Sequence, residues 1–373
     1  GADIFDKRWM DAVATIYEGY HKNEKYLRNT ASLARVAVIY SEQTDRNYGG
    51  KPWQQRSSDH IDGMYHALVE SRIPFDMVND RLLAPDDLKR FKLLILPNIA
   101  ALSEGQCRQL QAFVEAGGSI MATFETSLYD ENGNQRPDFG LASLFGVTYS
   151  QQVEGPLRNS YLHLRHDAKN TQNQLILKGL DDTPRIINAI YKVDVKPTTT
   201  FSSPVTLIPT YPDLPMEDVY PRIAETDTRE VYLRQVGKGR VAYLPGDLDR
   251  TFWQLLNTDH GQLLNNVITW ALDEKPIATV TGPGVVDMTV WRQAQSMTVH
   301  LVNLTNPMMM KGPFRELIPV AAEVMVRVPT GATVTGVELL MSGQKPTFKQ
   351  VDGKLTIAVP AILDHEIVAL DLA

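Results

Sequence analysis

Cysteine is almost absent from this sequence of 373 residues, since Cys107 is the only one. A single cysteine excludes a small disulfide-stapled scaffold and any zinc site built from cysteines at ordinary spacing. No apolar run approaches the ~20 residues of a membrane-spanning helix, so we expect no membrane partner. Basic residues number 37 against 44 acidic ones, and the net charge is −7. This balance argues against nucleic acid as a partner, because phosphate-backbone binders carry a basic surface.

Phosphate-binding and metal-binding motifs are also missing. Gly49-Gly50 lacks the following Lys-Ser/Thr of a P-loop. His163 and His166 lie three apart on a predicted strand and therefore point to opposite faces. His60 and His66 fall on different faces of a predicted helix, so we expect all four to be solvated or hydrogen-bonded. The sequence thus predicts no metal site and no cofactor.

The composition that is present is that of a globular protein, with 43% hydrophobic and 22% charged residues. The length predicts two or three domains. We expect a helical lead or connector at 1–33, with helix-like apolar spacing over 4–30, an α/β domain at 34–275 and a β-sandwich at 276–373. The start, GADIFDKRWMDAV, lacks the apolar core of a signal peptide, which favours a mature, cytosolic or trimmed chain.

Strands and helices alternate from residue 34 to about 148. The runs ARVAVIYS, KLLILPN and SIMATFE are continuously apolar, as strands buried on both faces are. Between the last two lies a helix with a capping box, Ser103-x-x-Gln106, and a terminal Gly117-Gly118. Alternation of this kind predicts a mostly parallel sheet covered by helices on both faces.

The pattern becomes antiparallel after residue 148. SYLHLRH, RIINAIYKVDV and PVTLIP predict an insertion at about 150–235, interrupted by a proline-rich loop. The hairpin EVYLRQV–GKG–RVAYLPGD and the helix after it then predict the return of the α/β sheet. Beyond the linker DEKP, alternating strands and an Asp352-Gly353 hairpin turn predict a small β-sandwich.

Cys107 is the first residue to test as a nucleophile. A nucleophile elbow would place it on a sharp turn directly after a strand. Its spacing with Leu110 and Val114 instead puts it on the buried face of the capped helix, where cysteine behaves as a small hydrophobe. We therefore interpret Cys107 as structural.

Polar residues follow several strands of the predicted sheet, where ligands of open α/β sheets bind. They are Ser41, Glu42, Asn98, Glu125 and Asp247. Glu125 and Asp247 are the weak catalytic candidates, one as general acid and one as base or nucleophile. The alternative, which we favour, is that they cap loops or pair with Arg250, and that Asp247 to Arg250 organise the strand-to-helix turn.

Aromatic residues occur near these carboxylates. Tyr48 and Trp53 lie in the loop after the first strand, and Trp253 follows the Gly-Asp turn. If exposed, they would suit stacking on a sugar ring, and together with Asn98 and Arg250 they are the candidate binding residues for a carbohydrate. Equally, they are candidate anchors of a subunit interface, where Trp and Tyr are enriched.

Taken in order, VAVIYS, ALVESRIPFDMVND, LLILPN, SEGQCRQLQAFVEAGGSIMATFETSLYDENG and GKGRVAYLPGDLDRTFW resemble the β-galactosidase trimerisation domain of family 42 glycoside hydrolases and their glycosidase-like relatives. The resemblance covers about residues 34–275. It implies a flavodoxin-like sheet of the class I glutamine amidotransferase type that lacks the catalytic cysteine. The C-terminal stretch VHLVNLTNPMMMKGP…LDHEIVALDL is similar to the small β-domain that follows in such proteins.

In that family a (β/α)8 barrel of about 250 residues carries the catalytic glutamates, and only about thirty residues precede the first strand here. No glutamate of this sequence matches those motifs. The first hypothesis is therefore a non-catalytic assembly region of a bacterial-type glycoside hydrolase-like protein, cytoplasmic or exported, forming a homo-oligomer through its α/β domain. The others are a self-sufficient carbohydrate hydrolase using Glu125 and Asp247, and a sugar-binding module.

Overall fold

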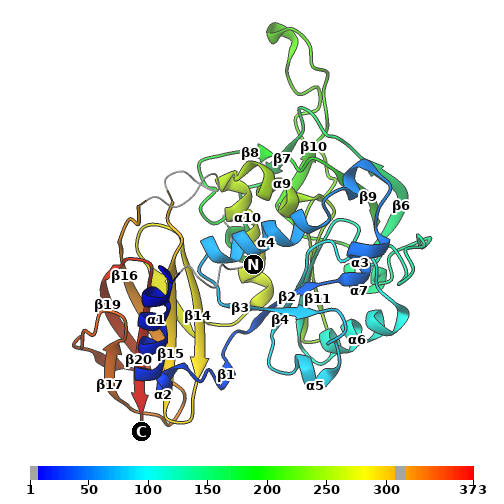
Figure 1. Ribbon diagram of the computed structural model, residues 1–373. Coiled ribbons are helices and arrows are strands. Elements are labelled where there is room, and N and C mark those ends of the chain that lie inside the picture. Colours follow the sequence, from blue (N-terminus) through cyan, green and yellow to red (C-terminus); the bar gives the residue numbers. More distant parts are fainter. Residues whose placement is uncertain (1–6, 168, 307–315) are drawn as a thin grey trace. The chain divides into compact units, whose positions relative to one another are not determined.

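The computed structural model describes residues 7–167, 169–306 and 316–373 (Figure 1). The chain forms two compact units. One comprises Arg35–Ser71 and Phe75–Lys275, and we call it the α/β unit. The other, the β-sandwich unit, takes the described residues of Gly1–Ala34, Arg72–Pro74 and Pro276–Ala373.

A six-stranded sheet forms the centre of the α/β unit, in the order β11-β12-β5-β4-β2-β3. Its strands are β2 (Val36–Tyr40), β3 (Phe75–Asn79), β4 (Leu93–Leu96), β5 (Ser119–Thr123), β11 (Tyr232–Val236) and β12 (Gly239–Leu244). Five of them are parallel, and β11 pairs antiparallel with β12 at one edge. In chain order the parallel strands lie 2-1-3-4-5. The predicted mostly parallel α/β sheet is confirmed.

Helices cover both faces of this sheet (Figure 1). One face carries α4 (Ser58–Glu70), α9 (Leu248–Leu255) and α10 (Thr258–Leu272), and the other α5 (Pro85–Leu88), α6 (Glu104–Glu115) and α7 (Ala142–Phe145). Short helices α3 (Glu42–Asn47) and η1 (Pro52–Gln54) follow β2. The capping box of α6 is formed on both sides, because Ser103 Oγ accepts from Gln106 N and Gln106 Oε1 accepts from Ser103 N.

The predicted antiparallel insertion is confirmed. β6 (Val147–Glu154) pairs with β9 (Lys192–Pro197). A second sheet has the order β10-β7-β8, from Val205–Ile208, Tyr161–Leu164 and Arg185–Ile187. Helix α8 (Thr171–Ile176) and the turn η2 (Met216–Asp218) complete the insertion.

Two antiparallel sheets pack around one apolar core in the β-sandwich unit, as predicted. The first holds β1 (Ala31–Ser32), β14 (Val286–Arg292), β15 (Ser296–Asn303), β20 (His365–Leu372) and β17 (Val334–Leu339). The second holds β13 (Ala278–Thr281), β16 (Val320–Arg327), β19 (Lys354–Ile362) and β18 (Lys349–Val351). The turn between β18 and β19 places Asp352 and Gly353 at positive φ, 50° and 69°, as the predicted hairpin requires.

The N-terminal helical lead is two helices rather than one. They are α1 (Met10–Lys22) and α2 (Glu24–Leu27), separated at Asn23. Residues 4–6 of the predicted helix lie outside the described residues. Tyr26 of α2 is buried and packs on β20, whereas α1 has no buried residue.

Candidate functional site

Glu125 lies in the turn after β5, at the carboxyl edge of the sheet, and its side chain is 1% exposed. Tyr48 OH and Trp53 Nε1 both donate to Glu125 Oε2, the indole at 3.2 Å. Tyr129 OH donates to Oε1 at 3.3 Å. Burial raises the pKa of this carboxyl, and the three donors only partly oppose that shift. Both carboxylate oxygens of Glu125 are therefore already occupied by side chains of its own unit.

Asn98 belongs to the same cluster. It follows β4 in a left-handed conformation, with φ 45°, and its backbone N–H donates to Thr123 Oγ1 at 2.9 Å. Its Nδ2 donates to Tyr48 OH at 3.3 Å. Tyr48 in turn is 4% exposed, and burial beside Glu125 holds its pKa well above the ordinary value. Tyr48 does not meet the condition of an exposed ring on which the sugar-stacking alternative depends, because its hydroxyl points into this buried cluster.

Asp247 organises the turn between β12 and α9. Its Oδ1 accepts from the backbone N–H of Tyr191 at 2.8 Å and from Thr251 Oγ1 at 3.1 Å. Its Oδ2 accepts from Arg250 Nη1 at 3.2 Å. Burial raises its pKa from 3.8 to about 6, against the lowering effects of His60, the Tyr191 N–H and Arg250. These contacts are those of a turn-organising residue and partner of Arg250.

Arg250 connects Asp247 to Glu125 through the residue Trp53. Besides Asp247, its Nη1 donates to the carbonyl oxygen of Trp53 at 3.2 Å. The Trp53 ring also lies beside Tyr191, with ring centroids 5.9 Å apart. The structure thus brings Tyr48, Trp53, Asn98, Glu125, Asp247 and Arg250 into one connected network.

The remaining predicted residues lie outside this network. Trp253 has its ring 5.6 Å from that of His66 on α4. Ser41 caps α3, accepting from Thr44 N at 3.0 Å and donating to Asp80 at 2.5 Å. Glu42 pairs with Arg46 and Arg81 at the surface. Their contacts are structural.

A buried His60–Asp249 pair was not anticipated. His60 Nδ1 lies 2.9 Å from Asp249 Oδ1, and Thr123 Oγ1 donates to Asp249 Oδ2 at 2.7 Å. Within the described part of the chain, His60 Nε2 has no hydrogen-bond partner. Gly63 permits the pairing, because a Cβ there would stand 1.9 Å from the Asp249 carbonyl oxygen. A glycine inside a predicted helix was the one sequence signal for this close crossing of α4 and α9.

Phe124 occupies a sharp turn immediately after β5, with φ 51°. A left-handed conformation is unusual for a bulky residue and is the backbone shape of a nucleophile elbow. Its side chain is buried and stacks on His60 with ring centroids 5.7 Å apart. The elbow-shaped turn therefore presents a phenyl ring and no nucleophile.

Cys107 is buried on α6 beside Leu110 and Val114, in agreement with the structural interpretation. Burial raises the pKa of its thiol to about 11, which keeps it protonated at neutral pH. Across the described residues, no group of three or more His, Cys, Asp or Glu side chains is placed to hold a metal ion. In that same part of the chain, no helix has the length and apolarity to cross a membrane.

Residues 34–181 match the family model of the β-galactosidase trimerisation domain. The resemblance inferred from the sequence is thus confirmed over these residues, and the matched region is of the kind found in glycoside hydrolases. Among curated relatives, β-galactosidase BbgII of Bifidobacterium bifidum is 32% identical over 103 residues, which are 26% of this chain and 14% of that protein. β-Galactosidase BglY of Alicyclobacillus acidocaldarius is 23% identical over 194 residues, 50% of this chain and 24% of that one.

Solved structures resemble almost the whole chain. α-L-Fucosidase isoenzyme 2 from Paenibacillus thiaminolyticus superposes with a TM-score of 0.74 at 18% identity, covering 99% of this chain and 53% of its own. A β-galactosidase from Bacillus circulans sp. alkalophilus gives 0.65 at 16% identity, covering 97% and 45%. The chain therefore spans about half the length of these solved relatives, and at such identities the likeness shows the fold alone.

Proposed function

We propose that this chain is a non-catalytic assembly and accessory region of a glycoside hydrolase-like protein active in carbohydrate metabolism. The match of residues 34–181 to the trimerisation domain supports this assignment. So does the length comparison, because the chain aligns along nearly all of its own length with only about half of each solved relative. The catalytic part of such a protein would then be a barrel outside this chain.

We assign the α/β unit to the flavodoxin-like, class I amidotransferase-like type. The strand order 2-1-3-4-5 supports this, since it is the flavodoxin order. Phe124 in the elbow-shaped turn, and Cys107 in the first turn of helix α6 rather than on an elbow, support a site of that type without a nucleophile. The proposed domains are a connector at 1–33, this domain at 34–275, and the sandwich at 276–373. We assign homo-oligomer formation to the α/β domain.

The single observation that carries the non-catalytic assignment is that both carboxylate oxygens of Glu125 are already hydrogen-bonded within the α/β unit. A glycosidase carboxylate must face a sugar, with a second carboxylate about 5–9.5 Å away. Glu125 instead accepts from Tyr48, Trp53 and Tyr129, and Asp247 accepts from Tyr191, Thr251 and Arg250. The burial of Tyr48 likewise removes one platform of the sugar-binding alternative.

The test is turnover of nitrophenyl β-galactoside and nitrophenyl α-fucoside by the purified chain. We expect no turnover above the uncatalysed rate, and Glu125→Gln should leave that result unchanged. The matched control is Glu42→Gln, which removes an exposed carboxylate near the same edge of the sheet. Turnover that Glu125→Gln abolishes and Glu42→Gln preserves would establish the hydrolase alternative instead.

A further inference from the structure

A long arm projects from the insertion of the α/β unit. It comprises residues 209–228, between β10 and β11, and rises away from the body of the unit at the top of Figure 1. Its base is fixed: Leu207 N donates to Thr228 O at 2.9 Å, and Arg165, which directly follows β7, pairs with Asp227 at 3.0 Å. Apart from the single turn η2 it has no secondary structure. Loops of this length without secondary structure are commonly functional.

The tip of the arm exposes apolar side chains between stiff prolines. Met216 is 92% exposed, and Leu214, Tyr220 and Ile223 are each at least 44% exposed. Four prolines restrict the backbone: Pro209, Pro212, Pro215 and Pro221. Such a cluster of exposed apolar groups marks an interaction site, and a stiff segment loses little entropy on binding.

The tip is also acidic. It carries Asp213, Glu217 and Asp218 against a single cation, Arg222. Arg222 stacks on Tyr220 and donates to the backbone carbonyl of Asp218. Over the described ranges, none of the three carboxylates forms an ion pair. The surface that receives this tip must therefore be apolar and positively charged.

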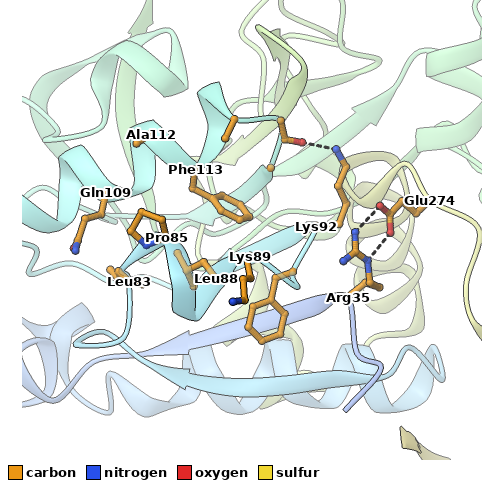
Figure 2. Close-up of a pocket in the computed structure, with 14 residues that line it drawn as sticks. Arg35, Leu83, Pro85, Leu88, Lys89, Lys92, Gln109, Ala112, Phe113 and Glu274 are labelled. Carbon is orange, nitrogen blue, oxygen red and sulfur yellow. Dashed lines mark hydrogen bonds and ion pairs between the residues drawn. The ribbon is translucent and has the colours of Figure 1, made fainter. Parts of the chain in front are cut away.

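A pocket of that chemistry lies on the same unit, between α5, α6 and the start of β4 (Figure 2). Its volume is about 740 Å³. Figure 2 shows Leu83, Pro85, Leu88 and Phe113 around it, with the ammonium-bearing Lys89 and Lys92.

The charge of the pocket is positive. Arg35 is neutralised by Glu274 through contacts of 2.9 and 2.8 Å. Lys92 Nζ donates to the backbone carbonyl of Gly117, an uncharged partner. Among the described residues, the carboxylate paired with Lys89 is that of the exposed Asp86 at 3.8 Å, a type of pair that contributes little. Two ammonium groups thus border an apolar hollow, complementing the acidic, apolar arm tip.

We propose that the arm of one copy of this chain docks its Met216 tip into this pocket of a second copy. The proposal rests on the oligomer assigned above and identifies the surfaces that form it. The occupant is a second copy because arm and pocket lie at opposite ends of one α/β unit (Figure 1), so the arm does not reach its own pocket. Arm and pocket are different surfaces, so the contact is head-to-tail and can close into a ring. We take the ring as a trimer, because the matched family model is that of a trimerisation domain.

The test is the mass of the full chain in solution, measured by light scattering and sedimentation. We expect about three times the 41.8 kDa chain mass. Met216→Asp replaces the apolar side chain at the tip by a charged one, and Ala112→Arg fills the pocket from an exposed position of α6. Each substitution should shift the mass to that of a monomer. An equimolar mixture of the two variants retains one intact arm and one intact pocket, so it should form a dimer and no ring. Leu255→Asp, an exposed apolar side chain on α9, is the matched control and should stay trimeric.

A cross-link makes the pairing specific. Cys107 is buried, so Met216→Cys with Ala112→Cys offers two accessible thiols, which should form a disulfide between copies on oxidation. An oligomer that survives both Met216→Asp and Ala112→Arg overturns the arm contact and leaves assembly intact. A monomeric wild type that also fails to cross-link overturns assembly and arm contact together. Loss of the oligomer in Met216→Asp alone overturns the pocket as its receptor, and points to another protein surface.

Discussion

At the scale of residues, the carboxyl edge of the sheet is a dense buried polar network. Glu125 and Asp247 are each enclosed by three side-chain or backbone donors. Charged groups are costly to bury, and donors offset that cost only in part. The consequence is a raised pKa at both carboxyls, with burial as the largest cause in each. The network therefore makes stability depend on pH.

Asp247→Asn should flatten that dependence. In the folded chain Asp247 has a pKa of about 6, above its ordinary 3.8, so the folded state binds the proton more tightly than the unfolded state. Its stabilising contribution is thus present below pH ~4 and is lost as pH rises through ~6. Between pH 4 and pH 7, denaturant unfolding should show a loss of unfolding free energy for wild type that exceeds the loss for Asp247→Asn by about 2 kcal/mol. Equal slopes in the two proteins would show that Asp247 does not titrate in this range. Glu125→Gln, measured in the same way, gives the part of the remaining pH dependence that comes from the other buried carboxyl.

At the scale of elements, much follows from local patterns. The capping box of α6, the Gly237-Lys238 turn between β11 and β12, and the Asp352-Gly353 turn were all predicted from short-range signals. The break at Asn23 was missed because the helix was extended beyond Tyr20, although residues 21–25 (HKNEK) contain no apolar side chain that would support it. The close crossing of α4 and α9 was missed because it depends on residues nearly 190 positions apart. Local patterns do not encode such long-range approaches.

Gly63→Ala should separate α4 from α9. A Cβ at this position would overlap the Asp249 carbonyl oxygen at 1.9 Å, so the helices must move apart and strain the His60–Asp249 pair. Overpacking of this kind costs typically about 1–3 kcal/mol. Gly105→Ala in α6 is the control, since its Cβ would meet only Ser103 Oγ at 3.7 Å and alanine favours a helix by roughly 0.5–1 kcal/mol. In urea unfolding, Gly105→Ala should be the most stable of the three proteins, wild type should follow, and Gly63→Ala should be the least stable. A Gly63→Ala protein as stable as wild type would contradict the crossing.

At the scale of the whole molecule, the sequence predicted the parallel sheet, the antiparallel insertion and the sandwich because each has its own hydrophobic period. It also placed Asn98, Glu125 and Asp247 at one edge, because the ends of parallel strands meet there. It did not predict their partners. Tyr129 and the orientation of Tyr48 depend on side-chain packing between distant loops. Nor did it predict that the proline-rich loop projects as an arm. Its prolines indicate a stiff backbone, but the amino-acid composition does not determine the direction in which the loop extends.

Assembly through the arm predicts a melting temperature that depends on concentration. Folded copies that bind one another stabilise the folded state by mass action, whereas a monomer unfolds at a temperature independent of its concentration. For a unit of this size, each tenfold increase in protein should raise Tm by on the order of 2–4 °C. Met216→Asp should abolish the increase and leave the Tm of the dilute protein unchanged, because Met216 is 92% exposed. Leu255→Asp should retain the increase. The measurement is differential scanning calorimetry from micromolar to hundreds of micromolar chain; a flat wild-type profile over that range would contradict assembly.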